Sequence, residues 1–206
     1  MEQRARSLTV GDLLGRIAAK TPTPGGGAVA PIVSALAAAL GQMVVSYSLG
    51  RKNLAEREPG LRASIDRLER ARSALLELAD EDASAYELVR ELSRLPEGDA
   101  RRRSELPGAV EIATRVPLAS SAAALTLLRH ILELAPRTNR SLRSDLAIAA
   151  ILAEASVRAS AVNVRINLPA FAREKGRESA DGIARELDGL CADAAEILRG
   201  VLGATA

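Results

Sequence analysis

The chain has 206 residues, and one domain over residues 1–206 with a single sizeable core accounts for that length. Apolar residues make up 48% and charged residues 26% of the sequence, which excludes a disordered chain. The net charge of +2 and the 1% of aromatic residues exclude a nucleic-acid binder that works by basic patches and base stacking. Ala and Leu dominate and favour helix, so the composition predicts an all-α protein.

The compartment is predicted from the cysteine count and the N-terminus. Cys191 is the only cysteine, so no intramolecular disulfide can form, which is typical of a reducing compartment. The first ten residues lack the apolar segment of a signal peptide. We therefore expect a cytoplasmic protein. With one cysteine and one histidine, His130, we also expect no metal site.

The first two predicted helices flank a stretch rich in proline and glycine. A helix is predicted over residues 8–19, with Thr9 as a candidate N-cap. The prolines and glycines of residues 21–27 are expected to stay outside any helix. A second helix follows over residues 28–48, with Pro31 tolerated in its first turn.

The second predicted helix is the most apolar part of the chain. No charged residue occurs from Gly25 to Gly50, which is long enough to span a bilayer. The segment is rich in Ala, Gly and Ser, which gain little free energy from lipid. We predict a fully buried core helix and no membrane association.

Residues 59–95 are predicted to form one helix of about 50 Å, at ~1.5 Å per residue. A compact domain of this size has a diameter near ~40 Å, so an elongated bundle or a second subunit must accommodate the helix. A polar break is predicted at residues 96–104. Four further helices are predicted at 107–116, 118–135, 141–168 and 170–201, separated in part by Pro117 and Pro169. The whole is predicted to be an elongated bundle of six or seven helices.

One carboxylate lies where the long helix should be apolar. Asp82 is seven residues from both Leu75 and Val89, so it shares their stripe, and Tyr86 covers the same patch one turn later. Burial raises the pKa of a carboxyl group toward the range useful for proton transfer. The alternative interpretation is an acidic run on a solvated face.

A polar stripe is predicted on the helix over residues 141–168. Residues 145 and 163 are five full turns apart, so they share one face. That face consists of Asp145, Ala149, Leu152, Ser156, Ser160, Asn163 and Asn167. Its Asn side chains can pair with a ligand or with the backbone of a neighbouring helix, and the spacing leaves both alternatives open.

The sequence Pro24-Gly25-Gly26-Gly27 opens a predicted helix with no acidic residue nearby. Free N–H groups at a helix start favour an anion, and glycine lets a ligand approach the backbone. Neither common nucleotide fingerprint is present. The alternative is a simple tight turn.

Several short motifs occur in a familiar order over roughly residues 8–170. They are Thr23–Ala30, Gly50–Lys52, Asp82–Tyr86, Arg94–Pro96, Val116–Leu118, Arg143–Leu146 and Asn163–Leu168. This ordered set resembles the formiminotetrahydrofolate cyclodeaminase / methenyltetrahydrofolate cyclohydrolase family. Three positions depart from the family pattern: Ala28 replaces a serine, Glu97 a lysine and Thr138 a glycine.

The resemblance implies an all-helical homodimer that binds folate near the subunit interface, with no cofactor beyond the tetrahydrofolate substrate. It implies that Asp82 is the catalytic carboxylate. The substrate-binding residues that we expect are Gly25, Gly26, Gly27, Arg51, Lys52, Tyr86, Asp145, Asn163 and Asn167. The glycine helix start, together with the two basic residues, is expected to hold the anionic glutamate tail.

The resemblance implies hydrolysis of 5,10-methenyltetrahydrofolate to 10-formyltetrahydrofolate. One alternative is the ammonia-releasing cyclodeamination of 5-formiminotetrahydrofolate. Because the sequence leaves no room for a formiminotransferase domain, we expect the cyclohydrolase. The other alternative is a non-catalytic helical protein that binds a folate-like anion or only dimerises.

Overall fold

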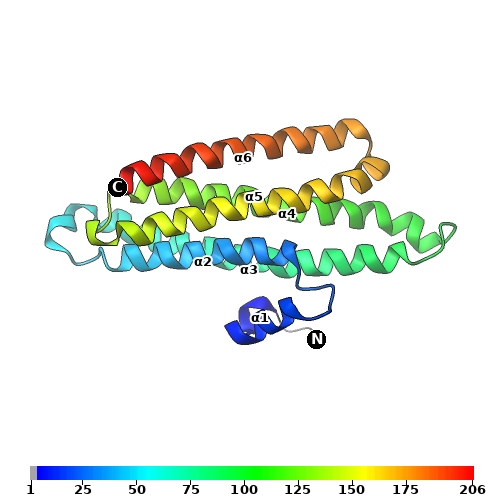
Figure 1. Cartoon of the computed structure of the whole chain (residues 1–206), viewed down its shortest axis with the longest axis horizontal. Helices are drawn as coiled ribbons and strands as arrows, with labels where there is room; N and C mark the ends of the chain where they lie inside the picture. Colours follow the sequence, from blue (N-terminus) through cyan, green and yellow to red (C-terminus); the bar gives the residue numbers. More distant parts are fainter. Residues whose placement is uncertain (1–3) are drawn as a thin grey trace.

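Helices account for nearly the whole of residues 4–206, the part of the chain that the computed structural model describes (Figure 1). The α-helices are α1 (Val10–Ala18), α2 (Gly26–Ser46), α3 (Glu58–Ser93), α4 (Ala100–Leu134), α5 (Arg143–Lys175) and α6 (Arg177–Thr205). Short 3₁₀ helices are η1 (Ala5–Ser7), η2 (Lys52–Arg57) and η3 (Arg140–Leu142). No strand occurs among these residues, so the predicted all-α bundle is confirmed.

Helix α2 lies between α3 and α5 and runs antiparallel to both (Figure 1). Its small side chains allow close approach, and Gly41 packs against Leu68 of α3, which a Cβ atom at residue 41 would meet at 3.5 Å. On the other side, the Ser156 hydroxyl of α5 donates a hydrogen bond of 2.7 Å to the Ala30 carbonyl. These contacts fix the register of α2 on both neighbours.

The predicted break in the fourth helix is wrong, because Pro107 and Pro117 both lie inside α4. A proline in a helix removes the hydrogen bond to the carbonyl four residues earlier and costs about 3 kcal/mol. Pro117 leaves the Ala113 carbonyl without that partner, and the Asn167 amide of α5 donates a hydrogen bond of 2.7 Å to it. The neighbouring helix thus supplies the missing donor.

The helix also begins earlier than predicted, inside the expected polar break. Asp99 caps its N-terminus and accepts hydrogen bonds from the backbone N–H groups of Arg101 and Arg102, at 2.8 and 3.0 Å. A carboxylate at this position satisfies donors that the first turn leaves free. The three arginines after Asp99 are therefore helical.

Two more proline predictions are corrected. Pro169 does not end α5, which continues to Lys175 and stops at Gly176, whose φ of 93° suits glycine. Pro31 lies in the second turn of α2, because that helix already begins at Gly26. Two of the glycines expected to stay outside the helix thus form its first turn.

The N-terminal segment, η1 and α1, stands beside the bundle as an arm (Figure 1). Thr9 caps α1 as predicted, accepting a hydrogen bond of 3.1 Å from the Asp12 N–H. None of the residues of α1 is buried. Besides the linker to α2, the arm meets the bundle through η1, which contacts α3.

The prediction of a fully buried second helix is wrong. Ala37 and Ala38 of α2 are buried in the core, but Leu36 is 58% exposed. The segments Gly26–Ser46 and Arg140–Lys175 are long and apolar enough to cross a membrane by length and composition, and about half of each is buried in the bundle. An apolar sequence does not distinguish the core face of a helix from an apolar surface face, which explains the error.

Candidate active site

Asp82 belongs to α3, and its carboxylate lies against the first turn of α2. A Cβ atom at residue 27 would lie 2.1 and 2.3 Å from the two carboxylate oxygens, far inside van der Waals contact. Only glycine leaves room for the carboxylate at this point. Because the N-terminus of a helix carries a partial positive charge, the position also suits a negative side chain.

Burial raises the pKa of Asp82 from 3.8 to about 6. A carboxyl group with this pKa is mostly ionised at neutral pH and is a stronger base than an exposed aspartate. It can therefore accept a proton from a bound water molecule at neutral pH. The sequence pattern predicted a place on the core stripe for this residue, and the structure leaves it partly buried.

Asn163 of α5 approaches the same helix start from the opposite side. Its Oδ1 atom lies 3.6 Å from the place of a Cβ atom on Gly26, and its Nδ2 atom donates a hydrogen bond of 3.2 Å to the Ala159 carbonyl. A groove of about 390 Å³ begins there and runs between α2 and α5. The carboxylate of α3 and the amide of α5 therefore both lie at the glycine start of α2.

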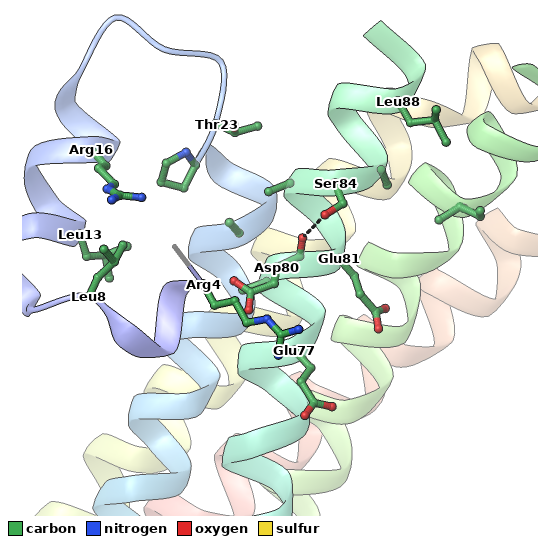
Figure 2. Close-up of a pocket in the computed structure, with 16 residues that line it drawn as sticks. Arg4, Leu8, Leu13, Arg16, Thr23, Glu77, Asp80, Glu81, Ser84 and Leu88 are labelled. Atoms are coloured by element: carbon green, nitrogen blue, oxygen red, sulfur yellow. Dashed lines mark hydrogen bonds between the residues drawn. The ribbon is translucent and has the colours of Figure 1, made fainter. Parts of the chain in front are cut away.

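A larger pocket, of about 700 Å³, lies between the N-terminal arm and α3 (Figure 2). Thr23 and Ala28 line it near the helix start, and Glu81 and Ala83, the neighbours of Asp82, line it on α3. The pocket thus borders the residues on either side of Asp82, which is not itself a lining residue, and it is large enough for a small-molecule ligand.

The arm contributes residues that the sequence analysis missed. Arg4 and Arg16 line the pocket from the arm, opposite Glu77 and Asp80 of α3 (Figure 2). The amphipathic pattern of the first helix is a signal that could have found Arg16, because Leu13 of the same helix also lines the pocket. Arg4 lies before that helix, and no sequence signal pointed to it.

Three of the predicted substrate-binding residues lie at the other end of the bundle. Arg51 and Lys52 follow the C-terminus of α2, whose 21 residues span about 31 Å at ~1.5 Å per residue. Asp145 is at the start of α5, which is held to the same end because the Asn139 N–H donates a hydrogen bond of 2.8 Å to the Ser48 hydroxyl. Within one chain, these residues do not join the glycine helix start, contrary to our expectation.

The remaining predicted residues differ in their surroundings. Tyr86 lies one turn beyond Asp82 and is 47% exposed. Asn167 uses its amide for the hydrogen bond to Ala113 described above, so the neighbouring-backbone alternative applies to it. Gly25 is the N-cap of α2 and adjoins Gly26 at the helix start.

The donor set at the site consists of a carboxylate, an amide and backbone groups. In residues 4–206 no three His, Cys, Asp or Glu side chains are placed to hold a metal ion. The fold and the site together define an all-helical protein with a partly buried carboxylate at a glycine-rich helix start.

The sequence profile of the Formiminotransferase-cyclodeaminase family matches residues 9–186, and the chain belongs to this family of enzymes. The chain is 32% identical over 194 residues to the methenyltetrahydrofolate cyclohydrolase of Methylorubrum extorquens, with 90% of each protein covered. It is 33% identical to the formimidoyltransferase-cyclodeaminase of Sus scrofa over 156 residues, 74% of this chain but only 29% of that protein.

A solved structure shows the same fold. The formiminotetrahydrofolate cyclodeaminase of Thermotoga maritima superimposes with a TM-score of 0.80 at 30% identity, covering 96% of this chain and 98% of that one. The resemblance drawn from the short motifs is thus confirmed.

Proposed function

We propose that the protein hydrolyses 5,10-methenyltetrahydrofolate to 10-formyltetrahydrofolate in one-carbon metabolism. The observation that carries this proposal is the partly buried carboxylate of Asp82, with a pKa of about 6, held over the glycine start of α2. The likeness to a methenyltetrahydrofolate cyclohydrolase over 90% of both chains supports it.

The substrate is already electrophilic, so the reaction depends mainly on a base that accepts a proton from water. The substrate carries a cationic amidinium carbon, which water attacks. Asp82 accepts a proton from that water as the carbon–oxygen bond forms. The bond from this carbon to N5 then breaks, N5 takes up one proton, and a second proton leaves as the formyl carbonyl forms. The charge of Asp82 also favours the cation near it.

Cyclodeamination of 5-formiminotetrahydrofolate is the second candidate function. It forms the same methenyl product and releases ammonia, so one carboxylate at the same place would serve as proton donor. The likeness to the Thermotoga maritima cyclodeaminase over 96% of this chain favours this candidate. Release of ammonia from the formimino substrate separates it from the cyclohydrolase.

The first experiment follows the loss of 5,10-methenyltetrahydrofolate absorbance near neutral pH, corrected for spontaneous hydrolysis. We expect the wild-type protein to accelerate the loss and Asp82→Asn not to. Acceleration by both proteins would remove Asp82 as the base. Acceleration by neither leads to the ammonia assay, and a negative result there favours a non-catalytic folate-binding or dimerising protein.

We also propose that the protein acts as a homodimer in the cytoplasm. The exposed apolar side chains of α2 and α5 support the homodimer, because a face of this kind is usually covered by a partner. The unpaired Cys191 is consistent with a reducing compartment. Size-exclusion chromatography with light scattering measures the oligomeric state directly.

A further inference from the structure

Helix α1 is too short to be stable without a packing partner. It has nine residues, and isolated helices shorter than about 12–15 residues are marginal in water. An amphipathic helix of this length is normally held by the packing of its apolar face on a neighbour. None of the residues of α1 is buried, and Leu13 is only partly so. The apolar face of α1 therefore has an incomplete packing partner in the bundle.

The space between α1 and the bundle is a pocket and not a packed interface. Leu8 and Leu13 of the arm line the pocket of about 700 Å³, and Leu88 of α3 and Ile112 of α4 line it from the other side (Figure 2). Ile112 is 50% exposed. Side chains gain dispersion and burial energy only from atoms that touch them. A small molecule in this pocket would touch both apolar walls, which do not touch each other across it.

The two walls of the pocket carry opposite charges. The arm contributes Arg4 and Arg16, and α3 contributes Glu77, Asp80 and Glu81. Figure 2 shows the Arg4 side chain pointing toward the acidic side of α3. Exposed charges attract one another over about 8 Å at physiological salt. They favour an arm that stays near α3, and three carboxylates against two guanidinium groups leave a net negative charge that suits a cationic ligand.

The linker between α1 and α2 leaves the arm able to move. Residues 19–25 include Pro22, Pro24 and Gly25. Their hydrogen bonds in the described part of the chain are to one another and to the ends of the two helices that they join. The other attachment of the arm is the contact of η1 with α3. A segment with so little buried surface opens at low cost in free energy and leaves the core intact.

We propose that the arm is a lid that a bound ligand closes. The opposite charges of the arm and α3 hold the lid near the pocket, and a ligand that packs against both Leu13 and Leu88 fixes it there. The ligand has an apolar body and a positive charge that faces the carboxylates of α3. The methenyl substrate has both features, and the lid rests on the proposed function for the identity of this ligand alone.

A closed lid would hold the ligand where the chemistry is proposed to occur. Glu81 and Ala83 line the pocket on either side of Asp82 in the sequence, so a ligand under the arm lies next to the segment that carries the base. A ligand that binds the closed arm better than the open one shifts the arm toward the closed state by that difference in affinity. Opening of such a lid then limits how fast the ligand leaves.

The lid is tested by amide hydrogen exchange on the wild-type protein, which needs no activity. We expect exchange over residues 10–18 to slow about tenfold or more in saturating folinic acid, because the ligand supplies the missing packing partner of α1. Glutamate alone should have no effect, and peptides from the core of α5 serve as the internal reference. If folinic acid raises the melting temperature but exchange in α1 stays fast, the proposal is wrong.

The role of the charges is tested without a ligand. Exchange in α1 should rise about two- to fivefold between about 20 and about 500 mM NaCl, because salt screens exposed charges that contribute little each. Glu77→Gln/Glu81→Gln should show the same rise already at low salt, and the sequence of α1 is unchanged in it. The matched control is Asp66→Asn/Glu186→Gln, which removes two exposed carboxylates outside the pocket and should behave like the wild type. Equal exchange in the two variants would show that these charges do not hold the arm.

Failure of the lid differs from failure of the proposed function. A protein that accelerates neither folate reaction, and whose melting temperature does not respond to folinic acid, contradicts the proposed function and removes this ligand. The salt dependence and the two charge variants then decide by themselves whether α3 holds the arm. Exchange in α1 that slows as the protein concentration rises would assign the apolar face of α1 to a second copy of the chain and overturn the proposal.

Discussion

The carboxylate of Asp82 occupies the space in which a side chain at residue 27 would begin, with Oδ2 2.1 Å from the place of a Cβ atom. The neighbouring glycine differs, because a Cβ atom on Gly26 would meet Asn163 at an ordinary contact distance of 3.6 Å. The Asp82 carboxylate thus requires glycine at residue 27, whereas Asn163 does not require glycine at residue 26.

Gly27→Ala should therefore displace the Asp82 carboxylate and lower kcat about 100-fold, the effect of a misplacement near 1 Å. Stability should be unchanged or raised by up to about 1 kcal/mol, because Ala favours helix over Gly. Gly26→Ala is the matched control and should retain activity within about tenfold, since its contact is ordinary. Equal losses in the two variants, measured as kcat with thermal unfolding, would contradict the argument.

The pH profile should report the carboxyl group directly. Because burial raises the pKa of Asp82 to about 6 and the ionised form is the base, kcat/KM should rise as pH increases through 6 and level off above 7. Initial rates in buffers of constant ionic strength from pH 5 to 8 measure this. A profile flat over that range would exclude Asp82 as the base.

The same pKa predicts that Asp82 destabilises the fold at neutral pH. The folded-state pKa of about 6 lies above the unfolded value of ~3.9, so the folded protein binds more protons between these values and loses stability as pH rises through that window. Asp82→Asn should therefore stabilise the protein by about 1–2 kcal/mol at pH 7, after a discount for solvent screening, and by nothing near pH 4. Urea denaturation at the two pH values tests the sign.

Asn163 and Asn167 should separate function from stability. Asn167→Ala leaves the Ala113 carbonyl without a donor inside the bundle, so we expect a loss of about 1–3 kcal/mol with kcat nearly unchanged. Asn163→Ala should leave stability within about 0.5 kcal/mol but weaken kcat/KM roughly tenfold. The opposite pattern would show that Asn163 stabilises the fold and that Asn167 contributes to the site.

A double-mutant cycle isolates the role of Asn167. Pro117→Ala restores a backbone N–H that can reach the Ala113 carbonyl, so the cost of Asn167→Ala should shrink in its presence. If the changes in the free energy of unfolding of the two single variants add up in the double variant, the Asn167 amide does not act through the Ala113 carbonyl.

Removal of the arm should affect binding more than folding. A chain that begins at Lys20 lacks α1, which has no buried residue, so its free energy of unfolding should change by less than about 1 kcal/mol. It also lacks the wall of the pocket that Arg4 and Arg16 form, so KM for the folate substrate should rise. An unchanged KM would show that the ligand does not use this pocket.

The sequence predicts helices well where one periodicity is unbroken. Helix α3 was expected over residues 59–95 and occupies Glu58–Ser93, because its apolar stripe persists for ten turns. The same stripe singled out Asp82. These predictions depend only on neighbours along one helix.

Predictions that depend on distant partners failed. Pro117 was expected to break a helix, but the donor that compensates for it comes from Asn167, fifty residues later. The separation of Arg51 from Gly27 is likewise a property of the packed bundle, because a motif records order along the chain and not distance in space.

The position of Asp82 also depends on the number of residues between two contacts that join α2 and α3. Gly41 meets Leu68 and Gly27 meets Asp82, so fourteen residues separate the two contacts on each helix. An insertion of one residue between them in α3 alone would turn Asp82 about 100° around the helix, and an insertion of seven would move it about 10.5 Å along the axis. Evolution can lengthen this enzyme freely at its loops, but between these contacts the two helices must change length together or not at all.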